Sequence, residues 1–367
     1  MALKKKIAFI IGGLSSGGAE RIISNLSNKL IDNYEVIIIT FKKSEPFYKL
    51  NPDVNIIYCM DKIIQPKNIF DSLKLNYTLI KKTIQILKFE KINLAIGFIT
   101  SANIITVISS KIIGIPSIIS ERNNPIIEDV PKFWRILRTL VYPKANYIVL
   151  QTNGIKDYYS KKIMPSKIGI LPNPISQELS NERNLDSEKK NIILSVGRLT
   201  KNKCHSILIN AISEIDIHDW EVVIVGNGEY KSNLEALITE LKLEHKIKLI
   251  EATNEISKYY NLAKIFVFTS RTEGFPNALL EAMHYGLPCI STDCLFGPAD
   301  LINNGKNGYL IPVNDKDKLK EHLISLIESK ELRMSLGAAA IKTTEKYDAT
   351  LVQQKWIAVI ERFINSK

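Results

Sequence analysis

Residues 265–292 read IFVFTSRTEGFPNALLEAMHYGLPCIST and contain a strand, a loop, a helix and a second strand in that order. The apolar ends of this segment predict buried strands, while Pro276 suits the first turn of a helix and Gly286 suits its exit. The loop would place backbone N–H groups at the start of the helix, where a bound anion is stabilised. The segment therefore predicts a parallel α/β sheet that binds an anionic ligand at the carboxyl end of a strand.

The alternation of strand and helix extends in both directions from this segment. In the second half, apolar runs predict further strands at 191–197, 220–226 and 246–250. The first half opens with a strand at 6–12, a helix at 19–31 and a strand at 35–41. Further strand candidates follow at 54–59, 94–98, 116–120 and 147–151. Near-continuous apolar character in these runs is typical of parallel sheets that are covered on both faces.

A polar stretch separates the two halves. Residues 171–190 contain a Pro-Asn-Pro turn followed by mostly polar residues, which is typical of a linker. We therefore predict an α/β protein with two doubly wound Rossmann-like domains, at 1–175 and 188–349, that face each other across a cleft. A final helical segment at 350–367 carries an apolar face formed by Leu351, Trp356, Val359, Ile360 and Phe363.

The composition is that of an ordinary globular protein, with 45% hydrophobic and 24% charged residues in a chain of 367. The apolar run at 7–11 is too short for a secretory signal, and no later run approaches the length of a membrane span. The four cysteines are scattered and lack histidines at metal-ligand spacing, which favours buried free thiols. We expect a cytoplasmic protein.

The net excess of positive charge lies entirely in the first half of the chain. Residues 1–180 hold 25 Lys and Arg against 13 Asp and Glu, which leaves 24 against 25 for the remainder. Such asymmetry indicates that the first half meets an anionic partner, such as nucleic acid, an acidic membrane surface or a phosphorylated substrate. The alternative is that the charge serves solubility alone. No aromatic and basic interleaving typical of RNA binding is present, so we expect no nucleic-acid partner.

Charged side chains follow the predicted strands of the second half. Arg198 and Lys203 lie five residues apart after one strand, and a planar guanidinium beside a point charge suits a leaving diphosphate. Glu273 lies in the loop before the helix of the opening segment, whereas Glu281 lies on that helix, where a carboxylate can accept hydrogen bonds from ribose hydroxyls. Gly226 ends a third strand, where a base or a ribose could approach the backbone closely.

Three motifs in this chain resemble glycosyltransferase family 4, and the resemblance spans almost the whole sequence. They are Glu-Gly-Phe-Pro-Asn-x-x-x-Glu at 273–281, Gly-Arg-x-x-x-x-Lys at 197–203 and Ser-Gly-Gly-Ala-Glu-Arg at 16–21. The resemblance implies the GT-B architecture and a retaining reaction that needs neither a metal nor a cofactor. It also implies that Arg198 and Lys203 hold the donor diphosphate.

The same resemblance assigns the remaining roles residue by residue. Glu273 would lie over the donor sugar and Glu281 would hold the ribose, so that Glu273, Arg198 and Lys203 are the expected catalytic residues. The expected donor-binding residues are Gly18, Gly226, Gly274, Phe275, Asn277, Ala278, Leu279 and Glu281. The segments 47–50, 120–123 and 296–300 also resemble those of bacterial enzymes that extend undecaprenyl-diphosphate-linked glycans, often with N-acetylhexosamines.

One position departs from the family pattern. Many relatives have a histidine after the glutamate of the Ser-Glu segment, whereas this chain has Arg122, and all five of its histidines lie beyond the expected linker. An inverting mechanism that relies on a histidine base in the first domain is therefore disfavoured, although Asp or Glu could still serve as a base. In a retaining reaction by front-face attack, the leaving phosphate itself takes the acceptor proton. Arg122 would then contact the donor sugar or an acceptor phosphate.

Two further features of the first half suggest acceptor binding. Gly17 and Gly18 precede the first helix, where they could form a mere turn or let a phosphate or an acceptor approach. The segment 70–92 carries a lysine ladder, which we define as Lys74, Lys81 and Lys88, beside the apolar residues Leu73, Tyr77, Ile80, Ile84 and Leu87. The ladder could be an ordinary solvated face, or it could contact the diphosphate and anionic headgroups around a polyprenyl-linked acceptor.

Other features have simpler explanations. Residues 132–141 form a second basic amphipathic segment that could dock on a membrane surface. Asp315 and Asp317 imitate an acidic metal-binding pair, but they open a polar helix, so capping is favoured. His284 could reach the donor from the helix of Glu281, but a structural helix histidine is favoured.

These observations predict a retaining glycosyltransferase at the inner face of the cell membrane. It would transfer a sugar, expected to be GalNAc or GlcNAc, from a UDP-sugar to a polyprenyl-diphosphate-linked glycan during surface polysaccharide or glycoprotein glycan assembly. The alternative is a nucleotide-sugar 2-epimerase of the same architecture. The basic first half argues against the epimerase, because such an enzyme has no acceptor to recruit.

Overall fold

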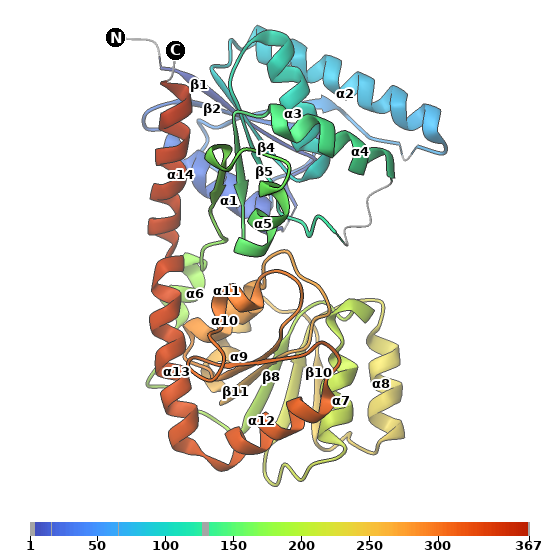
Figure 1. The fold of residues 1–367 in the computed structure, drawn as a ribbon, viewed down its shortest axis with the longest axis vertical. Helices are drawn as coiled ribbons and strands as arrows, with labels where there is room; N and C mark the ends of the chain where they lie inside the picture. The colour runs from blue at the N-terminus through green and yellow to red at the C-terminus, as the bar shows by residue number, and fades with distance from the viewer. Residues whose placement is uncertain (1–3, 16, 65, 127–131, 366–367) are drawn as a thin grey trace. The chain divides into compact units, whose positions relative to one another are not determined.

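A computed structural model describes residues 4–15, 17–64, 66–126 and 132–365 of the chain. The chain divides into two compact units, each of them a layered α/β structure (Figure 1). Unit 1 comprises Met1–Asn173 together with Thr350–Lys367, and unit 2 comprises Pro174–Ala349. Each unit is described by itself below.

Unit 1 is built on a seven-stranded parallel sheet in the order β3-β2-β1-β4-β5-β6-β7. Its strands are β1 (Lys6–Ile11), β2 (Glu35–Lys42), β3 (Asn55–Met60), β4 (Leu94–Phe98), β5 (Ser117–Ser120), β6 (Tyr147–Leu150) and β7 (Ile168–Ile170). Its helices are α1 (Gly18–Leu30), α2 (Ile69–Phe89), α3 (Thr100–Ile113), α4 (Lys132–Val141), α5 (Asn153–Ser160) and α14 (Ala349–Ile364), with short 3₁₀ turns η1 (Tyr142–Lys144) and η2 (Pro165–Lys167).

Unit 2 is built on a six-stranded parallel sheet in the order β10-β9-β8-β11-β12-β13. Its strands are β8 (Ile192–Val196), β9 (Glu221–Val225), β10 (Ile247–Ile250), β11 (Ile265–Phe268), β12 (Cys289–Thr292) and β13 (Tyr309–Ile311). Its helices are α6 (Gln177–Glu182), α7 (His205–Ile212), α8 (Lys231–Glu240), α9 (Ile256–Leu262), α10 (Asn277–His284), α11 (Pro298–Leu301), α12 (Lys316–Glu328) and α13 (Lys330–Thr344), with the 3₁₀ turns η3 (Lys201–Lys203) and η4 (Glu345–Tyr347).

The period of two along each strand divides the core of unit 1 into two layers. In β1, Ile7, Phe9 and Ile11 pack on the side of α1 and α14. The alternate residues Ala8 and Ile10 pack on the side of α2 and α3. Both faces of the sheet are thus covered, which explains why its strands read as continuous apolar runs.

Every strand expected from the sequence is present within one or two residues of its predicted bounds. The short strands β7 and β13 were not predicted, because three residues give no readable periodicity. Within the stretch expected to be a linker, Ser176 caps α6 by accepting from the N–H of Leu179, and the Leu179 side chain is buried.

Of the apolar side chains beside the lysine ladder on α2, only some are buried. Leu87 is buried and Ile80 packs against the core, whereas Leu73 and Tyr77 are 43% and 68% exposed. Leu79 and Thr83, which were not in the expected set, are also buried. Packing against neighbouring elements decides which side chains of α2 are buried. The hydroxyl of Thr83, for example, lies 3.8 Å from the sulfur of Cys59 on β3. Spacing alone could not choose between two apolar stripes on one helix.

The final helix, α14, belongs to the core of unit 1. Its buried residues Val352, Trp356, Ile360 and Ile364 are spaced four apart, and the Trp356 ring stacks on Phe98 at a centroid distance of 5.5 Å. Trp356 and Ile360 had been assigned correctly to the apolar face, whereas Leu351 is 45% exposed and lies off it. The last segment of the chain therefore completes the first unit.

Candidate active site

The strand order of unit 2 creates one point where a ligand crevice is expected. From β8 the chain adds β9 and β10 on one side, and it then adds β11, β12 and β13 on the other. Loops that leave the carboxyl ends of β8 and β11 therefore diverge, and ligands bind at such switch points in open α/β sheets. Arg198 and Lys203 follow β8, and Glu273 follows β11.

Lys203 and Glu273 form an ion pair at this switch point. Nζ of Lys203 lies 2.5 Å from Oε1 of Glu273, and the two side chains are only 17% and 11% exposed. The ammonium group also lies 5.2 Å from the centroid of the Phe268 ring at the end of β11. Two residues separated by seventy positions in the sequence are thus brought together at the carboxyl end of the sheet.

Hydrogen bonds fix the two loops relative to each other. The N–H of Arg271 donates to the carbonyl of Asn202 at 2.8 Å, and the amide of Asn202 donates to the carbonyl of Thr272 at 3.0 Å. Thr269 donates from its hydroxyl to the carbonyl of Lys203 at 2.9 Å. These contacts hold the backbone on both sides of the ion pair, so its geometry is set before any ligand arrives.

The glycine at the end of β9 has a packing role. A Cβ atom at Gly226 would lie 1.9 Å from the carbonyl oxygen of Gly197, so no side chain can be accommodated there. The N–H of Leu199 donates to the carbonyl of Asn227 at 2.9 Å, which joins the loops that follow β8 and β9. Arg198 is exposed beside this contact. Gly226 thus lets the loop that carries Arg198 lie close to its neighbour.

Helix α10 begins at Asn277, so Pro276, which was expected in its first turn, is the capping residue just before it. The helix ends before Gly286, whose φ of +71° favours glycine. Of the expected donor-binding residues, Phe275 and Leu279 are buried in the core, and the Phe275 ring lies 6.0 Å from that of Tyr347. Their side chains therefore support the helix rather than face a ligand. The half-buried residues are Gly274, Asn277, Ala278 and Glu281.

Sequence reasoning missed a tyrosine that contacts Glu281. The hydroxyl of Tyr260, on α9, donates to Oε2 of Glu281 at 3.1 Å. Burial, followed by the charge of Glu281, raises the pKa of Tyr260 well above its ordinary range. In the sequence this tyrosine reads only as a core aromatic of a short helix, so no local signal could have singled it out.

Two histidines of unit 2 are structural. His284 is held by α6, with Nε2 3.3 Å from the hydroxyl of Ser180 and Nδ1 3.2 Å from Nη1 of Arg183, and burial lowers its pKa to about 4. His205 is buried with Nδ1 3.3 Å from the hydroxyl of Ser195, and burial, followed by the charge of Lys203, lowers its pKa to about 4. Asp315 caps α12 by accepting from the N–H of Lys318, as the capping interpretation predicted.

In unit 1, Gly17 and Gly18 lie at the start of α1, in the segment that follows the carboxyl end of β1. Gly17 is the capping residue and Gly18 is the first residue of the helix, while residue 16 of the same motif lies outside the described residues. A Cβ at Gly17 would lie 2.1 Å from Oε2 of Glu20, whose other oxygen accepts from the Ser15 hydroxyl at 2.9 Å. Gly17 therefore makes room for a buried carboxylate at the start of the helix.

The guanidinium of Arg122 is buried in unit 1. It lies 5.3 Å from the Phe98 ring centroid and 5.7 Å from that of Trp356, and Nη1 donates to Oδ1 of Asn173 at 2.7 Å. Burial lowers the pKa of Arg122 to about 9, an effect that the neighbouring Glu121 opposes. Within the described residues, its Nε and Nη2 atoms have no hydrogen-bond partner. The arginine therefore braces α14 against the sheet, a role that its position in the sequence did not suggest.

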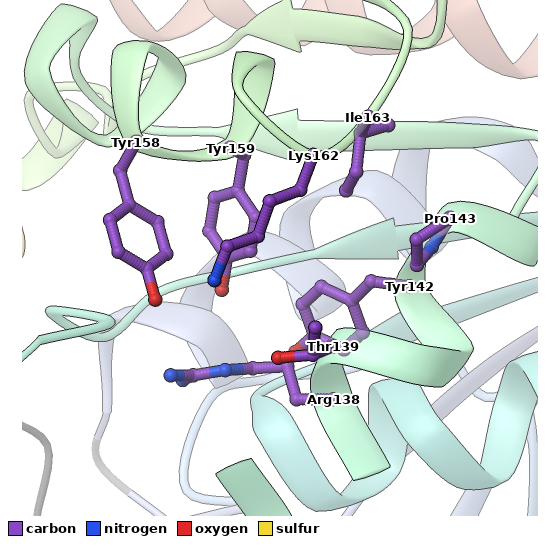
Figure 2. Close-up of a pocket in the computed structure, with 8 residues that line it drawn as sticks. All are labelled: Arg138, Thr139, Tyr142, Pro143, Tyr158, Tyr159, Lys162 and Ile163. Atoms are coloured by element: carbon purple, nitrogen blue, oxygen red, sulfur yellow. The ribbon is translucent and has the colours of Figure 1, made fainter. Parts of the chain in front are cut away.

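A buried polar cluster holds the loop that carries Arg122. The Glu121 carboxylate accepts from the hydroxyl of Tyr142 at 2.7 Å and lies 4.0 Å from Nη1 of Arg138. Figure 2 shows Tyr159 extending toward Tyr142 from α5, and the centroids of the two rings lie 5.8 Å apart. The adjoining pocket has a free volume of about 10 Å³, which is about what one water molecule needs, so it is too small for a sugar.

The lysine ladder lies on the exposed side of α2, and exposed apolar side chains lie on the same helix and on α4. Phe70 is 82% exposed, and on α4 Ile136 and Leu140 are 62% and 60% exposed. Lys132, in the second amphipathic segment, has a side chain outside the described ones. Within the parts of the chain that the structure describes, no helix combines the length and apolar character that a membrane crossing requires.

Comparison with known proteins gives consistent matches. A family model described as "Glycosyl transferases group 1" matches residues 176–343. A relative from Campylobacter jejuni, the GalNAc-alpha-(1->4)-GalNAc-alpha-(1->3)-diNAcBac-PP-undecaprenol alpha-1,4-N-acetyl-D-galactosaminyltransferase, is 29% identical over 98% of this chain and 99% of its own length. A second protein of that organism, the N-acetylgalactosamine-N,N'-diacetylbacillosaminyl-diphospho-undecaprenol 4-alpha-N-acetylgalactosaminyltransferase, is 30% identical over 94% of this chain and 96% of its own length.

Among solved structures, the Anabaena protein Alr3699/HepE in complex with UDP matches with a TM-score of 0.80. The match covers 97% of this chain and 100% of that protein at 17% sequence identity, so it shows the fold alone. That fold consists of two parallel α/β domains, as the sequence predicted.

Proposed function

Because the chain belongs to the glycosyl transferases of group 1, we propose that it transfers an N-acetylhexosamine, GalNAc or GlcNAc, from a UDP-sugar to a polyprenyl-diphosphate-linked glycan. It is a glycosyltransferase by its family. The finer assignment is supported by the two Campylobacter relatives, whose names describe GalNAc transfer to undecaprenyl-diphosphate-linked acceptors. The UDP bound in the HepE structure supports the choice of nucleotide.

The observation that carries the proposal is the ion pair of Lys203 and Glu273 at the switch point of unit 2. In the proposed complex, Arg198 and Lys203 neutralise the donor diphosphate, since a cation placed where charge develops stabilises the transition state. Lys203 is held in place by Glu273 until the diphosphate arrives. Glu281 accepts hydrogen bonds from the ribose hydroxyls.

The reaction is proposed to retain the configuration of the sugar. The acceptor hydroxyl attacks the anomeric carbon from the face that the diphosphate leaves. The bond from the anomeric carbon to the phosphate oxygen breaks as the new glycosidic bond forms, and the departing phosphate takes the acceptor proton. Glu273 stabilises the positive charge that develops on the donor sugar. No base from unit 1 is required, which agrees with the absence of histidine from residues 1–204 of the sequence.

The acceptor and membrane assignments rest on the surface of unit 1. The exposed apolar residues Phe70, Ile136 and Leu140, with lysines on α2, are the combination that docks helices on an anionic bilayer. We propose that the enzyme is a peripheral protein of the inner membrane face and that the lysine ladder contacts the acceptor diphosphate. Gly17 is proposed to lie at the acceptor and Gly18 at the donor. A contact of Arg122 with substrate would require it to leave its buried position.

An acceptor-dependent assay tests the proposal. UDP release is measured for a panel of UDP-sugars, with and without a short polyprenyl-diphosphate-linked sugar, in the presence of a metal chelator. Release that needs the acceptor and resists the chelator supports the proposal and identifies the donor. Interconversion of UDP-sugars without an acceptor would instead establish the 2-epimerase, which the transferase names of the two Campylobacter relatives do not favour.

A further inference from the structure

The carboxylate proposed to bind the ribose is itself bound by a tyrosine. The phenol oxygen of Tyr260 lies 3.1 Å from Oε2 of Glu281 and 3.4 Å from the carbonyl oxygen of Ala278. A phenol has one proton to donate, and the shorter, charge-assisted hydrogen bond is the stronger of the two. Tyr260 therefore donates to Glu281, from a helix that supplies none of the other residues assigned to the donor.

The position of this phenol is fixed by its surroundings. Tyr260 is fully buried, and its ring lies 5.2 Å from that of Tyr285 and 6.1 Å from that of Phe266, measured between centroids. Close packing against these rings in the buried core confines the Tyr260 side chain to one rotamer. Because its pKa is raised well above the ordinary range, the hydroxyl keeps its proton throughout the physiological range of pH.

We propose that Tyr260 is the positioning residue for ribose recognition, because its hydroxyl holds the Glu281 carboxylate in one orientation toward the ribose hydroxyls of the donor. This inference rests on the proposed function. A glutamate that is free to rotate loses side-chain entropy when it binds a ligand. A glutamate held by a rigid, buried phenol has lost that entropy on folding, so the ribose is bound more tightly.

The neighbouring tyrosine provides a matched control. Tyr285 is equally buried and belongs to the same aromatic cluster, but its hydroxyl donates to the carbonyl of Leu179 at 2.8 Å. Tyr285→Phe thus removes a buried phenol hydroxyl without removing a hydrogen bond to Glu281. Any effect of Tyr260→Phe that exceeds the effect of Tyr285→Phe reports on the carboxylate.

The test compares two nucleotides that differ only in the ribose. Binding of UDP and of 2′,3′-dideoxy-UDP is measured by calorimetry for the wild type, Tyr260→Phe and Tyr285→Phe. We expect Tyr260→Phe to raise the Kd of UDP about tenfold, since a hydrogen bond to a charged group is lost, and to change the Kd of dideoxy-UDP less than about twofold. Tyr285→Phe should change neither. Retained binding of dideoxy-UDP also shows that the variant is folded.

The outcomes separate the inference from the proposed function. If Tyr260→Phe weakens both nucleotides equally, or weakens neither, Tyr260 does not position the carboxylate and the inference is overturned. If the wild type binds both nucleotides equally, the assignment of Glu281 to the ribose is wrong and the inference falls with it. Steady-state kinetics give a second readout, in which Tyr260→Phe should raise KM for the UDP-sugar while kcat stays within about twofold.

Discussion

Replacing Lys203 with Gln should affect stability and catalysis by separate routes. Nζ of Lys203 lies 2.5 Å from the carboxylate of Glu273, and both side chains are more than four-fifths buried. Breaking a fully buried pair costs about 3–5 kcal/mol, and because this pair is still partly reached by water we expect Lys203→Gln to cost about 2 kcal/mol of unfolding free energy. The double change Lys203→Gln with Glu273→Gln leaves no unpaired charge and should recover most of that loss.

The catalytic loss should not recover in the double variant. Losing a cation that stabilises the leaving diphosphate is expected to lower kcat/KM by about 10²–10³-fold. Unfolding free energies come from urea titrations, and activity comes from acceptor-dependent UDP release. Lys201→Gln, an exposed lysine on the same 3₁₀ turn, is the control and should change neither quantity. Full activity in Lys203→Gln would show that Lys203 does not stabilise the leaving diphosphate, and equal stability of the single and double variants would show that the ion pair with Glu273 does not stabilise the fold.

Three further perturbations test other parts of the structure. Changing all three lysines of the ladder to Ser should raise KM for a lipid-linked acceptor and leave KM for the donor unchanged. The control variant Lys111→Ser on α3 should change neither KM. Unchanged kinetics in the triple variant would show that the ladder does not bind the acceptor. Trp356→Ala should lower the unfolding free energy by about 3–5 kcal/mol in denaturant titration, because it empties the contact between α14 and Phe98; a loss below about 1 kcal/mol would show that α14 is not part of the core. The pKa of His205 is about 4 in the folded protein against an ordinary value of 6.5, so the unfolded chain binds the proton first as the pH drops. The unfolding free energy should therefore fall between about pH 6.5 and about pH 4. His205→Asn should flatten that fall in urea titrations across this range, and an unaltered slope would contradict the burial of a neutral imidazole.

Much of unit 2 could be predicted because its signals are local. Pro276 and Gly286 mark the two ends of α10, and each acts through its own backbone geometry. The switch point also follows from the sequence, since charged residues after successive strands must meet at one edge of a parallel sheet. The ion pair of Lys203 and Glu273 was not itself predicted, but the meeting of their loops was.

The features that escaped prediction depend on contacts between distant segments. In the sequence, Tyr260 is indistinguishable from any core aromatic residue. Its contact with Glu281 forms only because the fold places α9 beside α10. The sequence neighbours of Arg122 indicated a contact with substrate, whereas its guanidinium lies near the rings of both Phe98 and Trp356, the latter more than two hundred positions later. On α2, the spacing of apolar residues allows more than one buried face, and only the packing against the rest of unit 1 shows that Leu79 and Leu87 lie in the core.

The proposed transfer of an N-acetylhexosamine to a lipid-linked glycan can be observed on the acceptor itself. The most direct measurement is the mass of a polyprenyl-diphosphate-linked acceptor after incubation with UDP-GalNAc or UDP-GlcNAc, for the wild type and for Lys203→Gln. We predict that the wild type adds one or more N-acetylhexosamine units and that the variant adds them far more slowly. An acceptor of unchanged mass beside a UDP-sugar converted to its 2-epimer would show that the chain is an epimerase and not a transferase.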